Sequence, residues 1–204
     1  MLLEKELLKL NGMKKERMFN PILIENFLSQ EECDFIVNLL ESKDAWEKSH
    51  DPHWDKMSIH KPAGEKAFGN EYASLLKEKT LKIKTIIEER YSLEKEVFPD
   101  TACLNRWPQG RKQEPHSDDM MFNGISVPGF GHRVFGSLIY LNNNFEGGNL
   151  YYPNHKFTVV PKPGLLAIHP GDAEHLHGVT EVLSGMRYTI ASFWTYDELK
   201  SVIW

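Results

Sequence analysis

The chain has 204 residues, of which 41% are hydrophobic and 26% are charged. This balance is typical of a folded soluble protein and excludes the low hydrophobicity of a disordered chain. Because 29 Asp and Glu residues outnumber 24 Lys and Arg residues, the charge does not favour binding to the phosphate backbone of nucleic acid. At this length we expect one domain with a sizeable core.

The first ten residues, MLLEKELLKL, interleave apolar residues with Glu and Lys. This pattern matches neither the apolar core of a secretory signal nor a membrane span, so we expect a cytoplasmic protein without membrane contact. The two cysteines, Cys33 and Cys103, make no disulfide framework and no Cys-x-x-Cys zinc pair, and we expect two buried thiols. Any bound metal would therefore have nitrogen and oxygen ligands.

Two helices are predicted before residue 95. Residues 29–32, Ser-Gln-Glu-Glu, form a capping box ahead of an apolar stripe, which predicts a helix over about residues 29–42. Residues 65–91 repeat apolar side chains at helical spacing among Lys and Glu, which predicts a long amphipathic helix with a solvated charged face. The segment 46–64 between them has no clear period, and we expect strand and loop there.

After Pro99 the chain consists of short runs rich in β-branched and aromatic residues, such as GSLIYL and RYTIASFW, bounded by Gly, Pro and Asn. Such runs are typical of β-strands. No helical pattern of ten or more residues intervenes, so the spacing suits a sandwich or a jelly roll. We expect Gly147 and Gly148 to form a tight turn between two strands rather than a phosphate cradle.

His116 and Asp118 are separated by one residue. In an extended chain their side chains point to the same side, so an imidazole and a carboxylate can converge on one ion. A second histidine from a distant strand would complete the ligand set typical of non-haem iron(II) oxygenases, which leaves positions open for cosubstrate and oxygen. A His-x-Asp pair also arises by chance, and His116 alone could be an ordinary surface residue.

Residues 177–187, HGVTEVLSGMR, supply both a histidine and an arginine. With His116 and Asp118 they resemble the prolyl 4-hydroxylase-like branch of the 2-oxoglutarate oxygenase superfamily, in which Lys or Arg follows the second histidine by ten residues. Arg187 has this offset from His177, so the resemblance implies that His116, Asp118 and His177 hold the metal and act in catalysis. His169 and His175 would then be loop residues or residues behind the ligands. Further matching segments are WPQG (107–110), EPH (114–116), LIYLNN (138–143), EGGNL (146–150) and PKPG (161–164).

The resemblance, which covers roughly residues 100–197, implies an α+β fold. Its core would be a double-stranded β-helix, or jelly roll, over residues 96–204. Residues 1–95 would supply flanking helices and strands as part of the same domain. It also implies Fe(II), 2-oxoglutarate and O2, and possible use of ascorbate. The implied reaction is hydroxylation of a substrate, coupled to conversion of 2-oxoglutarate to succinate and CO2.

A guanidinium suits the remote carboxylate of 2-oxoglutarate because it can make two parallel hydrogen bonds, so we expect Arg187 to anchor that end. Thr189 faces the same side of a regular strand and is a candidate for the same carboxylate. The family's tyrosine nine residues before the first histidine is replaced here by Trp107. An indole can only donate a hydrogen bond, so Tyr140 is expected to share or replace its contact.

The resemblance favours peptidyl proline as substrate. A small metabolite or free amino acid is an alternative substrate, because specificity lies in loops. A non-catalytic jelly-roll module with a vestigial metal site is the alternative of a different class. Residues 119–132 are interpreted either as a substrate lid or as a surface insertion. Phe193 and Trp194 either wall the pocket or pack in the core, and at least one is expected in the core.

Overall fold

The computed structural model describes residues 19–43, 45–50, 54–60, 63–119 and 130–201. Two α-helices lie in these ranges, α2 (Gln30–Ser42) and α3 (Ala63–Arg90). The capping box of α2 is confirmed, since Ser29 Oγ accepts from the Glu32 amide at 3.1 Å and the Glu32 carboxylate accepts from the Ser29 amide at 2.8 Å. The long second helix is also confirmed, with an interruption at Gly69, whose φ is 82°.

The strand-rich second half predicted after Pro99 is confirmed within the described residues. The strand pairs in the described ranges are all antiparallel. The strands are β1 (Ile22–Ile24), β2 (Ser58–His60), β3 (Phe98–Pro108), β4 (Gln113–His116), β5 (Arg133–Tyr140), β6 (Phe145–Gly147), β7 (Leu150–Tyr152), β8 (Phe157–Val159), β9 (Leu166–Pro170), β10 (His177–Val179) and β11 (Val182–Thr195). Short 3-10 turns occupy Pro153–His155, Ala173–His175 and Glu198–Lys200.

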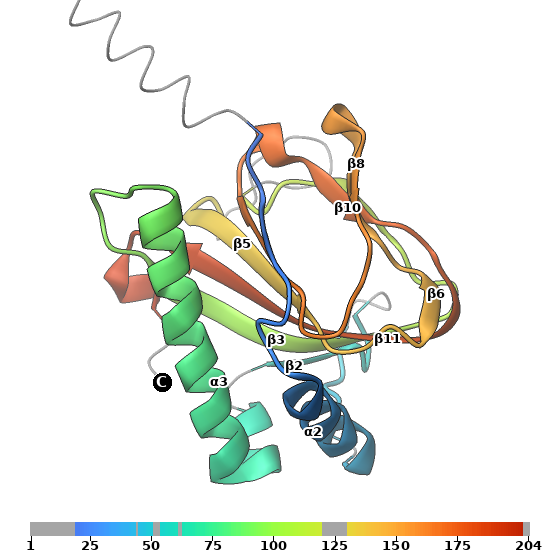
Figure 1. Ribbon diagram of the computed structural model, residues 1–204. Helices are drawn as coiled ribbons and strands as arrows, with labels where there is room; N and C mark the ends of the chain where they lie inside the picture. The colour runs from blue at the N-terminus through green and yellow to red at the C-terminus, as the bar shows by residue number, and fades with distance from the viewer. Residues whose placement is uncertain (1–18, 44, 51–53, 61–62, 120–129, 202–204) are drawn as a thin grey trace, which may run out of the picture.

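The strands form two sheets. The larger has the order β1-β9-β5-β11-β3-β2, with β6 on β11, and the smaller has the order β4-β10-β7-β8. Figure 1 shows α2 and α3 on one side of the larger sheet and the smaller sheet on the other. The main core joins the helices to the larger sheet, with Ile36 and Ile87 packed in the same cluster as Ile139 and Trp194. The chain is therefore mostly β-sheet, backed by two helices.

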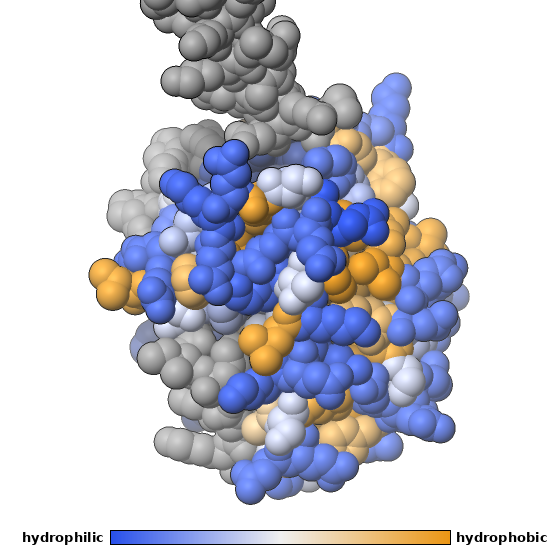
Figure 2. Space-filling view, turned by 60° about the vertical axis from the view of Figure 1, so that its left-hand side comes forward, coloured by the Kyte–Doolittle hydropathy of each residue, from blue (hydrophilic) through white to orange (hydrophobic). Residues whose placement is uncertain are grey.

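The outer side of the helical layer is polar. Figure 2, which brings the left-hand side of Figure 1 forward, shows a mostly hydrophilic face with scattered hydrophobic residues. This agrees with the solvated charged face predicted for the long helix. Within the described residues, neither helix combines the length and apolarity needed to cross a membrane.

The two cysteines differ in their surroundings. Cys33 is fully buried on α2, as expected, but Cys103 on β3 is only half-buried and lines a cavity described below. Cys103 is therefore less buried as a residue than expected, although its sulfur atom lies away from solvent. Burial of the sulfur atoms raises the pKa of both thiols to about 11.

The turn predicted at Gly147 and Gly148 is confirmed, because these residues connect β6 to β7 with φ values of 73° and 60°. Such values favour glycine. Gly148 has a second role: a Cβ there would lie 2.8 Å from Cδ of Arg187. The turn thus leaves room for the arginine side chain next to it.

Candidate metal centre and its cavity

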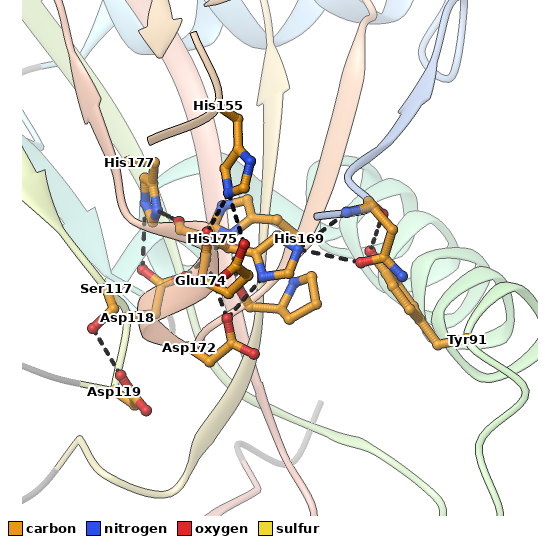
Figure 3. Close-up of polar contacts among 12 residues, drawn as sticks. Tyr91, Ser117, Asp118, Asp119, His155, His169, Asp172, Glu174, His175 and His177 are labelled. Atoms are coloured by element: carbon orange, nitrogen blue, oxygen red, sulfur yellow. Dashed lines mark hydrogen bonds and ion pairs between the residues drawn. The ribbon is translucent and has the colours of Figure 1, made fainter. Parts of the chain in front are cut away.

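His116, Asp118 and His177 lie together in the structure. His116 ends β4 and His177 begins β10, and the two are Cα partners across the smaller sheet. Asp118 follows His116 by two residues, and one ligand atom from each of the three side chains lies within 4.8 Å of the others. Asp118 and His177 are each 7% exposed, and His116 is half-buried. Figure 3 shows His177 and Asp118 facing each other.

The hydrogen bonds of His177 show which ring nitrogen faces the cluster. Its Nδ1 lies 2.9 Å from the carbonyl oxygen of His175, and a carbonyl only accepts, so Nδ1 carries the hydrogen. Burial, with the neighbouring His169 and His116, holds the pKa of His177 well below its usual range. The ring is therefore neutral, and Nε2 is an acceptor.

This Nε2 lies 3.7 Å from Oδ1 of Asp118, which is also an acceptor. Two acceptors that face each other in a buried place, with no hydrogen between them, fit a cation held by both. His116 has the same arrangement, with its Nδ1 at 3.0 Å from the Glu114 carbonyl. A histidine that donates one ring N–H to a carbonyl and presents the other nitrogen is the usual form of a metal-ligating imidazole. The donor set therefore fits a divalent metal with nitrogen and oxygen ligands.

His175 is turned away from this cluster. Its Nδ1 lies 2.7 Å from Oδ1 of Asp172, and Figure 3 shows these two side chains together. Its Nε2 lies 3.2 Å from both the amide nitrogen and the side-chain oxygen of Asn20. Burial raises the pKa of Asp172, but the hydrogen bond and charge of His175 outweigh it and hold that pKa below its usual range. His175 thus ties residues near the start of the described chain to the 3-10 turn at 173–175.

His169 does not lie in a loop but on β9, where it is 3% exposed. Its ring centroid lies 4.2 Å from that of His177, so it packs directly against the cluster. Its Nδ1 lies 3.1 Å from the carbonyl oxygen of Pro170 and 3.9 Å from Oδ2 of Asp118. Burial lowers the pKa of His169.

Arg187 lies on β11 and is 1% exposed. Its Cα partner on β3 is Trp107, and its guanidinium lies 5.4 Å from the Trp107 ring and 5.1 Å from the Tyr140 ring. Among the described residues, Nε and Nη2 of Arg187 have no hydrogen-bond partner. Burial lowers the pKa of Arg187, although the charge and hydrogen bond of Tyr140 act against this. Because buried donors without partners are costly, this position fits an anionic ligand.

Thr189 lies two residues further along β11, is fully buried, and pairs with Tyr140 on β5. Its hydroxyl also lacks a hydrogen-bond partner within the described part of the chain. The Tyr140 hydroxyl, in contrast, accepts from the amide of Leu150 at 3.3 Å. The structure therefore brings together the four residues predicted around the cosubstrate, which are Trp107, Tyr140, Arg187 and Thr189. Arg187 and Thr189 both have buried hydrogen-bond donors without a partner among the described residues.

One cavity of about 680 Å³ joins these groups. It is lined by the three clustered side chains and by Trp107, Arg187 and Thr189, whereas Tyr140 lies behind them. Residues from 47–49 and 54–60 also border it, among them Glu47, Trp54 and His60. The predicted lid at 119–132 lies largely outside the described residues, since 120–129 are not described.

The cavity also contains a stack that sequence reasoning missed. The Arg133 guanidinium lies 4.0 Å from the ring centroid of Phe130 and 3.8 Å from that of Phe193, and its Nε donates to Asp100 at 2.9 Å. Phe130 is 43% exposed, so this stack lies where the cavity reaches the surface. Of the two aromatics in question, Phe193 walls the cavity and Trp194 is fully buried in the core, as expected for at least one of them.

Comparison with known proteins gave consistent matches. A family model described as the 2OG-Fe(II) oxygenase superfamily matches residues 102–196. Prolyl 3-hydroxylase 1 of Gallus gallus is 24% identical over 92% of this chain and 30% of its own length. Prolyl 3-hydroxylase 2 of Homo sapiens is 23% identical over 94% of this chain and 31% of its own. The chain thus spans under a third of the length of these relatives.

Two solved structures resemble the whole described fold. The viral collagen prolyl hydroxylase of Paramecium Bursaria Chlorella virus-1, in its 2OG complex, has a TM-score of 0.64 at 18% identity, with 90% of this chain and 96% of that chain covered. A prolyl hydroxylase from Trichoplax adhaerens, in complex with a hypoxia inducible factor peptide fragment, has a TM-score of 0.63 at 19% identity, with 98% and 93% covered. At these identities the likeness shows the fold.

Proposed function

We propose, from the premise that the chain belongs to the 2OG-Fe(II) oxygenase superfamily, that it is an Fe(II)- and 2-oxoglutarate-dependent dioxygenase that hydroxylates prolyl residues of a peptide or protein. One observation carries this proposal. A cavity holds both a His-Asp-His cluster, in which two acceptors face each other at 3.7 Å, and a buried guanidinium with unused donors. These are the two sites that the metal and an anionic cosubstrate would need.

In this proposal His116, Asp118 and His177 hold the iron. When bound, the iron would supply the redox chemistry of a hydroxylation in which O2 is the oxidant and 2-oxoglutarate is converted to succinate and CO2. Arg187 binds the cosubstrate carboxylate remote from the metal, and Thr189 donates its hydroxyl to the same group. The rings of Trp107 and Tyr140 hold the guanidinium between them and exclude water. We also infer that the strands from β3 onward form the double-stranded β-helix core proposed over residues 96–204, with β1, β2 and the helices as its support.

Peptidyl proline is proposed as the substrate for two reasons. The relatives and the structural neighbours are named as prolyl hydroxylases, and one neighbour is bound to a peptide fragment. Independently, the outer part of the cavity contains the aromatic rings of Phe130 and Phe193, which stack on Arg133 and add apolar surface that suits contact with a pyrrolidine ring.

The test is to supply the purified chain with Fe(II), 2-oxoglutarate, ascorbate and O2, and to measure succinate with and without proline-containing peptides. We expect peptide-stimulated succinate and a peptide mass gain of one oxygen, and hydroxyproline analysis would then distinguish the 3- and 4-isomers. The variant His177→Ala should give neither product. Absence of succinate from the native chain under every condition would refute the dioxygenase proposal, and succinate without peptide hydroxylation would refute the substrate.

A further inference from the structure

His169 is buried against the metal cluster, although the ligand set above does not use it. A carbonyl oxygen only accepts hydrogen bonds, so the 3.1 Å contact between His169 Nδ1 and the Pro170 carbonyl places the ring hydrogen on Nδ1. That same N–H lies 3.9 Å from Oδ2 of Asp118. Both side chains are 4% exposed, so neither group is well solvated.

Oδ2 of Asp118 has no hydrogen-bond partner among the described residues, although it is buried. A buried carboxylate oxygen without a partner is costly. The His169 N–H is the nearby donor, and the separation is only about 1 Å longer than a charge-assisted hydrogen bond. A carboxylate is also a stronger acceptor than the Pro170 carbonyl that the N–H now contacts. The pairing of these two groups would therefore satisfy the unpaired oxygen.

Gly136 leaves the space in which Asp118 and His169 approach each other. It is the Cα partner of His169 across β5 and β9. A Cβ at Gly136 would lie 2.1 Å from Oδ2 of Asp118 and 3.0 Å from Cε1 of His169. The space that a side chain would fill on β5 is thus occupied jointly by the carboxylate and the imidazole. The backbone at this point is shaped to let them approach.

We propose that His169 is a positioning residue for the metal site: its Nδ1–H supports Oδ2 of Asp118, which leaves Oδ1 to face the metal alone. The carboxylate would then present Oδ1 to a bound metal while Oδ2 stays on the imidazole. This inference rests on the metal site proposed above. Removal of a group that hydrogen-bonds to a metal ligand typically lowers metal affinity 10–100-fold.

The test uses Co(II) alone, whose visible absorption reports both affinity and coordination. In His169→Asn the side-chain amide nitrogen can occupy the position of Nδ1, which is the donor in the proposal. In His169→Gln the amide nitrogen instead occupies the position of Nε2. We therefore expect His169→Asn to bind Co(II) within about threefold of the native chain, and His169→Gln and His169→Phe to bind roughly 10–100-fold more weakly with an altered spectrum. Melting of each metal-free variant checks folding, and His155→Asn, which alters an imidazole stacked on Phe19 outside the cavity, should match the native chain.

Equal Co(II) affinity in all the variants would overturn the proposal, and so would a loss in His169→Asn as large as in His169→Phe, which would mean that ring packing alone matters. If His169→Phe does not fold, the comparison of Asn with Gln still decides. If the native chain itself binds no Co(II), that result refutes the proposed metal site, on which the role of His169 depends.

Discussion

Replacement of Arg187 by Met should abolish 2-oxoglutarate binding without destabilising the ligand-free protein. The guanidinium is 1% exposed, and its Nε and Nη2 find no partner within the described residues. These two donors therefore contribute binding energy only when an anion arrives. A structural arginine would behave in the opposite way, since its loss would lower stability whether or not the cosubstrate were present.

The magnitudes can be estimated from these contacts. Loss of one partner of a buried, hydrogen-bonded charge pair costs roughly 2–5 kcal/mol, which raises the dissociation constant of 2-oxoglutarate between about 30-fold and several thousandfold. In the ligand-free protein, two unpaired buried donors each cost roughly 1–3 kcal/mol. The two cation–π contacts offset part of this by up to about 2 kcal/mol each. We therefore expect the free energy of unfolding of Arg187→Met to stay within about 1 kcal/mol of the native value or to exceed it.

The assay is thermal unfolding with Mn(II), with and without 2-oxoglutarate. Ligand at about 100 times its dissociation constant stabilises the native chain by about 2.7 kcal/mol, which is roughly 5–11 °C for a domain of this size. Arg187→Met should show no such shift. Arg133→Met is the matched control, because that guanidinium lies in the same cavity between Phe130 and Phe193. A full shift in Arg187→Met, or a loss of more than about 4 °C without ligand, would refute the reasoning.

Three further outcomes are expected. His177→Ala should lose Co(II) binding in a titration, whereas His175→Ala should keep it and melt at a lower temperature because buried hydrogen bonds are lost; the reverse pattern would exchange their roles. Gly136→Ala should weaken Co(II) binding at least about tenfold, because its Cβ would lie 2.1 Å from Oδ2 of Asp118, and unchanged affinity would argue against this packing. Ser29→Ala removes the cap of α2 and should cost about 1 kcal/mol, a fall of about 2–4 °C in melting temperature, while metal affinity stays the same.

The sequence signals that succeeded are local ones. The capping box before α2 involves groups three residues apart, and each partner of the box is present in the structure. The His-x-Asp pair needs only an extended chain to bring its two side chains to one side. His177 was separated from His175 by its offset from Arg187, and the structure places His177 in the cluster and His175 on Asp172 and Asn20.

The features that were missed depend on contacts between distant strands. Arg133 on β5 stacks on Phe193 of β11, and His169 on β9 reaches Asp118 only because Gly136 lies between them. The two pairs are 60 and 51 positions apart in the sequence and meet according to strand register. Periodicity along one strand does not contain that register, so no local pattern could indicate the stack or the pairing.

The alternation of side chains along β11 and β3 accounts for the positions of Cys103 and Phe193 in the cavity wall. On β11 the cavity is lined by Arg187, Thr189, Ala191 and Phe193, while the intervening Tyr188, Ile190 and Trp194 pack in the core. On β3 the same parity takes Trp107 and Asn105 to Cys103 and Thr101, all of which line the cavity. Once Trp107 and Arg187 are assigned to the pocket, this parity places Cys103 and Phe193 in its wall, so both positions could be derived from the sequence.

The same parity shows why the register of β11 decides whether the cavity can act as a single site. Arg187 is paired with Trp107 on one side, and Thr189 is paired with both Asn105 and Tyr140. A slip by one residue would turn the guanidinium into the helix-facing core and bring Tyr188 into the cavity. Such a slip would take the guanidinium away from the rings of Trp107 and Tyr140 and from the cavity in which an anion can pair with it, and burial of the charge without these partners is costly. The arginine that suits an anionic cosubstrate therefore also helps to specify the pairing of the strand that carries it.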